Sequence, residues 1–231
     1  MNAIETQPST MILIPVKNLG SAKQRLADAL DQATRTKLAQ TMLFDVLDGV
    51  NSLRDRPEVA LVTSDDFATH LAKQFGFDVI ADESNLGETA AIAMATELCE
   101  SRGVESTLVI PGDIPLVTAG ELEQILHAAP AEGSVLVPAA DGRGTNAAFR
   151  RPAGLFPLRF GNDSFKPHLA AARATEKQCV VLNLPGIALD VDNPADLRQL
   201  AAAQGETRTQ RLVRGWDFLS LITSLPQAAG E

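Results

Sequence analysis

The chain has 231 residues, of which 45% are hydrophobic and 21% charged, and its formal net charge is −9 at pH 7. This length suits one sizeable α/β core. The acidic balance, with 4% aromatic residues and no tyrosine, argues against a nucleic-acid partner, because no basic or base-stacking surface is visible. No apolar run approaches the roughly 20 residues that cross a bilayer.

The first residues of the chain and its two cysteines bear on its cellular location. The first ten residues lack the basic and apolar regions of a signal peptide. Cys99 and Cys179 have no His or Cys neighbours at metal-ligand spacing, which is typical of small core residues in a reducing compartment. We expect a cytoplasmic protein without a membrane partner. One domain spans residues 1–231, including a loose leader (1–10) and a C-terminal helical extension (206–231).

Hydrophobic periodicity divides most of the chain into alternating strands and helices. Short aliphatic runs predict buried strands, and apolar residues at i, i+3 and i+4 predict amphipathic helices. Strands are expected at 11–14, 59–62, 77–80, 107–110, 134–137 and 179–182, with a further strand segment at 187–191. Helices are expected at 39–50, 67–75, 87–100, 118–128, 163–174, after Pro194 and around 211–222, whereas residues 140–165 look irregular. This alternation predicts a three-layer α/β/α, Rossmann-like fold with a mostly parallel sheet and right-handed crossovers.

The first strand ends in a basic loop. After Pro15, the loop carries Lys17, Lys23 and Arg25 together with a glycine. Because anionic ligands bind at the carboxyl ends of parallel strands, this loop is a candidate anion site. The alternative is that these charges form only a solvated loop.

Acidic residues follow two other strands. Asp113 comes directly after the buried run 107–110, although aspartate also favours turns for local hydrogen-bonding reasons. Asp190 and Asp192 alternate along the expected strand end, so their side chains should point to opposite faces, one toward the site and the other capping the next helix. If Asp113 and Asp192 converge, they make a two-carboxylate site of the type that Mg²⁺ prefers beside substrate phosphates.

A third group lies in the irregular stretch. Ser164 stands at the start of an expected helix, where backbone N–H groups bind anions, and Thr145 and Gly161 would add a hydroxyl and an unshielded backbone. Plain N-capping is the alternative role for Ser164, and His168 is expected to be a satisfied helix residue. After the first strand there is neither the GxGxxG dinucleotide motif nor a P-loop motif, and no nucleophile elbow appears in the sequence.

Five segments in a fixed order resemble a known family. IPVKNLGSAKQRL, PGDIPLVT, GRGTNAAF, FGNDSFKPHLAAA and LDVDNPADL are similar to the guanylyltransferases of coenzyme F420 biosynthesis, and the likeness covers about residues 11–200. The resemblance implies transfer of GMP from GTP to 2-phospho-L-lactate, phosphoenolpyruvate or 3-phospho-D-glycerate, with release of pyrophosphate. It also implies the wider nucleotidyltransferase fold.

The resemblance assigns roles to three sets of residues. The phosphorylated acid would be held by Thr145, Gly161 and Ser164, and Mg²⁺ by Asp113 and Asp192. Lys17, Lys23 and Arg25 would act on the GTP phosphates as the catalytic cations. The nucleotide site as a whole would comprise Pro15, Val16, Lys17, Lys23, Ser64, Asp82 and Gly87.

This chemistry needs no side-chain general base, because the acceptor phosphate is already ionised near neutral pH. Alignment of the two anions and neutralisation of their charge would then supply the catalysis. The alternatives are a molybdopterin or sugar-phosphate nucleotidyltransferase and, in a different class, a non-catalytic nucleotide-sensing module. A homodimer and a transient hand-off of the product to the next F420-pathway enzyme are further hypotheses.

Overall fold

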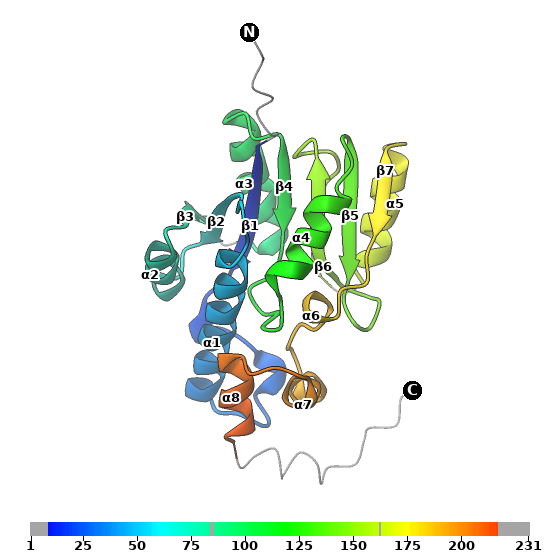
Figure 1. Cartoon of the computed structure of the whole chain (residues 1–231). Helices are drawn as coiled ribbons and strands as arrows, with labels where there is room; N and C mark the ends of the chain where they lie inside the picture. Colours follow the sequence, from blue (N-terminus) through cyan, green and yellow to red (C-terminus); the bar gives the residue numbers. More distant parts are fainter. Residues whose placement is uncertain (1–8, 84–85, 162, 217–231) are drawn as a thin grey trace.

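The fold is built on one seven-stranded sheet in a computed structural model that describes residues 9–83, 86–161 and 163–216. The spatial order is β3-β2-β1-β4-β6-β5-β7, and β6 is antiparallel to both of its neighbours while the other pairings are parallel. The strands are β1 Thr10–Val16, β2 Glu58–Thr63, β3 Asp78–Ala81, β4 Ser106–Val109, β5 Gly133–Pro138, β6 Thr145–Arg151 and β7 Gln178–Val181. The predicted α/β class with a mostly parallel sheet is confirmed (Figure 1).

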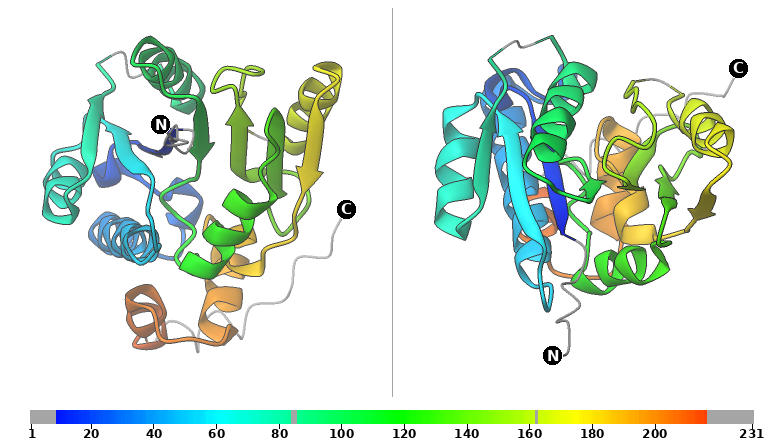
Figure 2. Two further views of the ribbon diagram at one scale, coloured as in Figure 1. Left: turned by 45° about the horizontal axis from the view of Figure 1, so that its top comes forward. Right: turned by 90° about the horizontal axis from the view of Figure 1, so that it is seen from above.

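Helices cover both faces of the sheet (Figure 2). They are α1 Gln32–Asn51, α2 Asp66–Phe75, α3 Glu88–Ser101, α4 Ala119–Ala128, α5 Phe165–Ala174, α6 Pro185–Ala188, α7 Pro194–Ala202 and α8 Arg208–Arg214. Along β1, Ile12 and Ile14 belong to the core that contains α1, α2 and α4, whereas Met11 and Leu13 belong to the core that contains α3 and α5. The period-2 alternation of a strand therefore feeds two hydrophobic cores, which explains why the run 11–14 is apolar at every position.

Helix ends follow the local capping signals. Asp65 caps α2 through Ala68 N, and Gly76 closes the helix in the left-handed conformation at φ 68°. Thr118 opens α4 with a capping box, and Asn193 does the same for α7 with Pro194 in the first turn. Within the described residues, no helix combines the length and apolar character needed to span a bilayer.

Three expectations for the elements are corrected. The stretch expected to be irregular contains β6, a central strand. The expected strand 187–191 is instead the end of α6 followed by irregular chain, because Pro185 opens a short helix there. The last helix starts at Arg208 rather than near residue 211. The rest of its expected range, from residue 217 on, lies outside the described residues, and so do residues 1–8 of the expected leader.

Candidate active site

The candidate site lies where β1 and β4 end, at the same edge of the sheet. The loop after β1 contains two short 3-10 turns, Leu19–Ser21 and Gln24–Leu26, with Lys23 between them. The turn after β4 carries Asp113, and the segment between α6 and α7 carries Asp192. Two of these stretches meet because the carboxyl ends of the parallel strands β1 and β4 lie at one edge of the sheet, and the segment between α6 and α7 reaches the same point.

Lys23 joins the two aspartates. Its Nζ donates to Asp113 Oδ2 at 2.5 Å and to Asp192 Oδ1 at 2.8 Å, and its side chain is only 8% exposed. Arg25 Nη1 approaches the other carboxylate oxygen of Asp192 at 3.3 Å from a much more exposed position. The convergence of Asp113 and Asp192 that the sequence suggested is therefore present, with a lysine ammonium between them.

Backbone contacts fix this arrangement. The carbonyl oxygen of Asp113 accepts a hydrogen bond from Val191 N, which ties the two acidic segments together. Gly112, just after β4, packs closely against α1 and β1, because a Cβ there would lie 3.3 Å from the Leu43 side chain and 3.5 Å from the Val16 side chain. Asp65, at the end of β2, accepts from Leu19 N and so supports the basic loop from the other side. The site thus rests on the three adjacent strands β2, β1 and β4.

Charges in the site perturb one another. Burial alone would lower the pKa of Lys23, but the carboxylates of Asp113 and Asp192 outweigh it and hold the pKa above its ordinary value. For Asp192, burial opposes ionisation, yet Lys23 lowers the pKa. Burial raises the pKa of Asp190. Burial and then the charge of Asp113 raise the pKa of Glu88 to about 7. Lys23 and Asp192 are therefore an ionised pair.

A second group of polar side chains forms the opposite wall. Ser164 Oγ accepts from Thr145 N at 3.1 Å, and His168 Nδ1 lies 2.9 Å from Thr145 Oγ1. Because Arg159 N donates to His168 Nε2, the ring proton is on Nδ1 and is donated to Thr145. The pKa of His168 is lowered to about 4, chiefly by burial, so the ring is neutral and satisfied, as expected.

The position of Ser164 is as predicted, but its hydroxyl does not cap the helix. Ser164 is the N-cap residue of α5, and its side chain makes no capping bond. The hydroxyl instead binds the first residue of β6, which sequence reasoning did not recognise as a strand. Thr145 and Ser164 therefore present adjacent hydroxyl groups on one surface.

Asp190 and Asp192 do not point to opposite faces, and neither caps α7. Both line the same cleft, because the chain around them is irregular and not a strand. Asn146 holds Asp190: its Nδ2 donates at 3.0 Å to Asp190 Oδ1 and to the carbonyl oxygens of Ile187 and Ala188. Asn146 was not a predicted site residue, although it lies inside the segment GRGTN.

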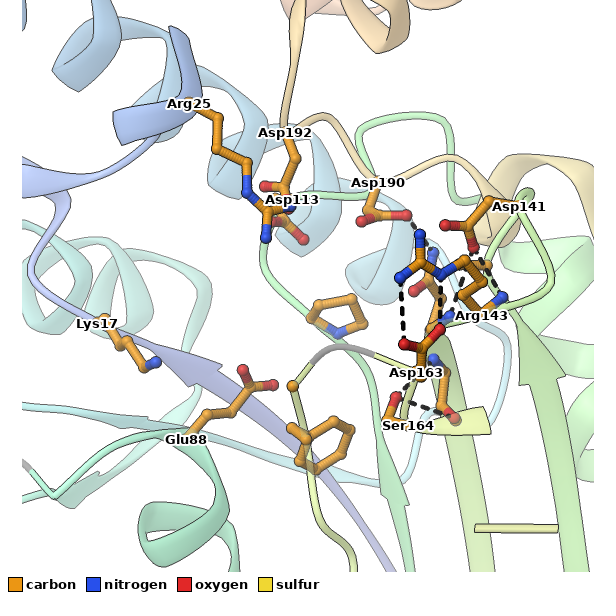
Figure 3. A pocket seen from close by; sticks show the side chains of 17 residues that line it. Lys17, Arg25, Glu88, Asp113, Asp141, Arg143, Asp163, Ser164, Asp190 and Asp192 are labelled. Atoms are coloured by element: carbon orange, nitrogen blue, oxygen red, sulfur yellow. Dashed lines mark hydrogen bonds and ion pairs between the residues drawn. The ribbon is translucent and has the colours of Figure 1, made fainter. Parts of the chain in front are cut away.

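These groups surround a cleft of about 650 Å³. Figure 3 shows Lys17 and Glu88 on one side and Arg143, Asp163 and Ser164 on the other. The predicted site residues that line this cleft are Lys17, Arg25, Asp113, Thr145, Gly161, Ser164 and Asp192. Glu88, which was not a predicted site residue, also lines this cleft. The sequence signal that could have indicated it is its place in the first turn of the helix expected from residue 87.

A smaller cleft of about 320 Å³ adjoins the first and is lined by Pro15, Val16, Lys17 and Lys23, among others. The two clefts share Lys17, Glu88, Pro111 and Asp113. The remaining predicted nucleotide residues are not among those that line either cleft. Ser64 is exposed after β2, Asp82 is buried after β3 and Gly87 precedes α3. Their roles stay predictions.

Solved structures share this fold. A putative nucleotide-diphospho-sugar transferase from Desulfovibrio desulfuricans superposes with a TM-score of 0.76 at 20% identity, covering 93% of this chain and 96% of that one. A cytidylyltransferase from Leptospira borgpetersenii superposes at 0.57 with 13% identity, covering 96% and 99%. The fold is that of the α/β nucleotidyltransferases.

Sequence comparison gives the family. Residues 10–221 match the family described as "Guanylyl transferase CofC like". The phosphoenolpyruvate guanylyltransferase of Sphaerobacter thermophilus is 32% identical over 84% of this chain and 93% of its own length. The 3-phospho-D-glycerate guanylyltransferase of Colwellia psychrerythraea is 33% identical over 83% and 91%. The chain belongs to this guanylyl transferase family and is a nucleotidyltransferase.

Proposed function

We propose that this protein transfers GMP from GTP to the phosphate of a small phosphorylated carboxylic acid and releases pyrophosphate, as a cytoplasmic step of coenzyme F420 biosynthesis. The acceptor would be phosphoenolpyruvate, 3-phospho-D-glycerate or 2-phospho-L-lactate. Relatives named for the first two of these acids support the acceptor class.

The observation that carries the proposal is the meeting of two clefts at Asp113 and Lys17. The nucleotide would occupy the smaller cleft, beside Val16, Lys17 and Lys23. The acid would occupy the larger one, against Thr145 and Ser164. Its phosphate would then face the α-phosphate of the nucleotide at the shared boundary, which is the alignment that a displacement between two anions requires.

The reaction needs little covalent chemistry from the protein. An ionised oxygen of the acceptor phosphate attacks the α-phosphorus, the bond from that phosphorus to the bridging oxygen breaks, and pyrophosphate leaves with the electron pair. A phosphate monoester has a second pKa near 6, so the attacking oxygen is deprotonated at about pH 7 without a base. Lys17, Lys23 and Arg25 would offset the negative charge of the phosphates.

The carboxylates of Asp113 and Asp192 fit a magnesium ion. Both direct oxygens toward a single point, which Lys23 Nζ marks. No set of three or more His, Cys, Asp or Glu side chains within the described segments has the arrangement of a metal cage. Mg²⁺ characteristically takes one or two carboxylates and fills its other positions with water and substrate phosphates. A bound ion would supply charge stabilisation to the α-phosphate and the leaving pyrophosphate.

The acid would be held by the Thr145–Ser164 wall. Thr145 Oγ1 accepts a hydrogen bond from His168 Nδ1, so the threonine hydroxyl proton is left to donate. Gly161, at φ 139°, adopts a backbone conformation that a side chain would strain, and nothing lies within 4 Å of where a Cβ would be. These donors suit a carboxylate or a hydroxyl of a small acid.

The test is pyrophosphate release by the purified protein with GTP, Mg²⁺ and each of the three acids separately, followed by ATP and CTP with the same acids. We expect release with GTP and with one acid above the others, and a product mass equal to GMP joined to that acid. Release with CTP, or with a sugar phosphate as acceptor, would reassign the protein to another nucleotidyltransferase class. GTP binding without release with any acid would refute the proposal.

A further inference from the structure

Lys23 occupies the place that a divalent ion would need. Its ammonium lies 2.5 Å from Asp113 Oδ2 and 2.8 Å from Asp192 Oδ1. A magnesium ion bound to those same oxygens at about 2.0–2.1 Å would stand almost where Nζ stands. The two cations therefore exclude each other at this pair of oxygens, by volume and by charge.

The backbone holds Lys23 in this position. Lys23 adopts a left-handed conformation, φ 57° and ψ 44°, which is uncommon for a residue with a Cβ. The next turn, Gln24–Leu26, begins directly after it, and Leu26 N donates to the carbonyl oxygen of Lys23. The side chain is nearly buried, so the ammonium has exchanged its water for the two carboxylates.

The smaller cleft offers Lys23 other anions. Lys23 lines this cleft together with Val16 and Lys17, whereas its neighbour Arg25 lines the larger cleft. A nucleoside triphosphate bound there would bring several negative charges beside Lys23. The ammonium could then pair with a phosphate and release the two carboxylates without remaining unpaired.

We propose that Lys23 is a tethered counter-cation that fills the metal position of the nucleotide-free enzyme, so that a divalent ion gains Asp113 and Asp192 only together with a nucleoside triphosphate. The inference rests on the metal assignment in the proposed function. Its consequence is a strong coupling between metal and nucleotide, which by linkage must be reciprocal. The exchange also keeps the two neighbouring, partly exposed carboxylates from facing each other without a cation between them.

The experiment measures Mn²⁺ binding by electron paramagnetic resonance, without an acceptor acid and therefore without turnover. We expect the wild-type protein to bind Mn²⁺ weakly alone and roughly 5- to 150-fold more tightly with GTP, the usual range of such coupling. The Lys23→Met protein should bind Mn²⁺ tightly without GTP and lose most of the coupling. The Lys37→Met protein, changed at an exposed lysine of α1, should behave as the wild type.

Two further readouts keep the result independent of folding and of activity. The thermal midpoint of Lys23→Met should fall without metal and recover with Mn²⁺, whereas that of the wild type should not respond to Mn²⁺ alone. Adding Asp113→Asn to Lys23→Met should remove the gained Mn²⁺ site, and Lys23→Gln repeats the test with a polar side chain.

Tight Mn²⁺ binding by the nucleotide-free wild type would overturn the proposal, as would no gain in either Lys23 variant. Pyrophosphate release by the wild type is measured separately, so a failure of the proposed function is distinguished from a failure of this inference.

Discussion

Asn146 is the residue whose removal most directly tests how the acidic segment is positioned. It lies on β6 and is 5% exposed, and its single amide nitrogen serves three acceptors on the segment that leads to Asp192. The change Asn146→Ala leaves the Ile187 carbonyl without this donor, while the Ala188 carbonyl keeps a bond from Ala140 N at 2.8 Å. Asp190 loses the donor that favours its charged form.

The size of the effect follows from these bonds. A buried acceptor left unsatisfied costs about 1–3 kcal/mol. For a chain of this length, each kcal/mol shifts the thermal midpoint by about 2–4 °C, so we expect Asn146→Ala to melt roughly 2–12 °C lower. The same loosening reaches Asp192, and we expect the Mg²⁺ concentration for half-maximal turnover to rise several-fold while the nucleotide KM changes little.

Calorimetry and a magnesium titration of pyrophosphate release measure the two effects. Asn51→Ala, an exposed asparagine at the end of α1, is the matched control and should change neither. An Asn146→Ala protein that melts lower with an unchanged Mg²⁺ requirement would show that the amide stabilises the fold without positioning the carboxylates. An unchanged melting midpoint would refute the hydrogen-bond argument itself.

Three further changes test other parts of the site. Asp113→Ala should lose most turnover, because it removes half of the carboxylate pair, and it should stay folded by circular dichroism. Glu132→Gln, which changes an exposed partner of Lys177, is the control and should keep its turnover. Near-normal turnover of Asp113→Ala at saturating Mg²⁺ would contradict the metal role. Ser164→Ala should chiefly raise the KM for the acid in steady-state kinetics, and an effect confined to GTP would contradict its assignment. The pKa of Glu88 is raised from 4.5 to about 7, so the folded state retains a proton that the unfolded chain loses, and stability is lost as pH rises from about 4.5 through 7. Relative to the wild type, the melting midpoint of Glu88→Gln should therefore be higher at pH 8 than at pH 5, and equal offsets at both pH values would refute the shift.

Local sequence patterns were sufficient to predict an element where its burial is uniform or where its ends are set by residues within one turn. The run 11–14 predicts β1 because both faces of that strand are buried, and Asp65 and Gly76 predict the limits of α2 because caps act within one turn. Strand β6 was missed because it carries Arg150, which is 2% exposed. Its two Nη atoms donate to the Phe156 carbonyl oxygen and to two threonine hydroxyls, which compensates for much of the cost of burying the charge, while Nε has no partner among the described residues. The two threonines, Thr96 and Thr107, are distant in sequence, so no local window contains them.

The sequence by itself determined the alternation of strands and helices, and hence a mostly parallel sheet with polar residues at its carboxyl edge. It also carried the five ordered segments that point to the guanylyl transferase family. Only the tertiary structure decided that Lys23 stands between Asp113 and Asp192 and that Asp190 and Asp192 line one cleft. The reason is physical: periodicity encodes which face of an element is buried, whereas the meeting of side chains from three separate loops depends on how the layers pack and where each turn directs the chain.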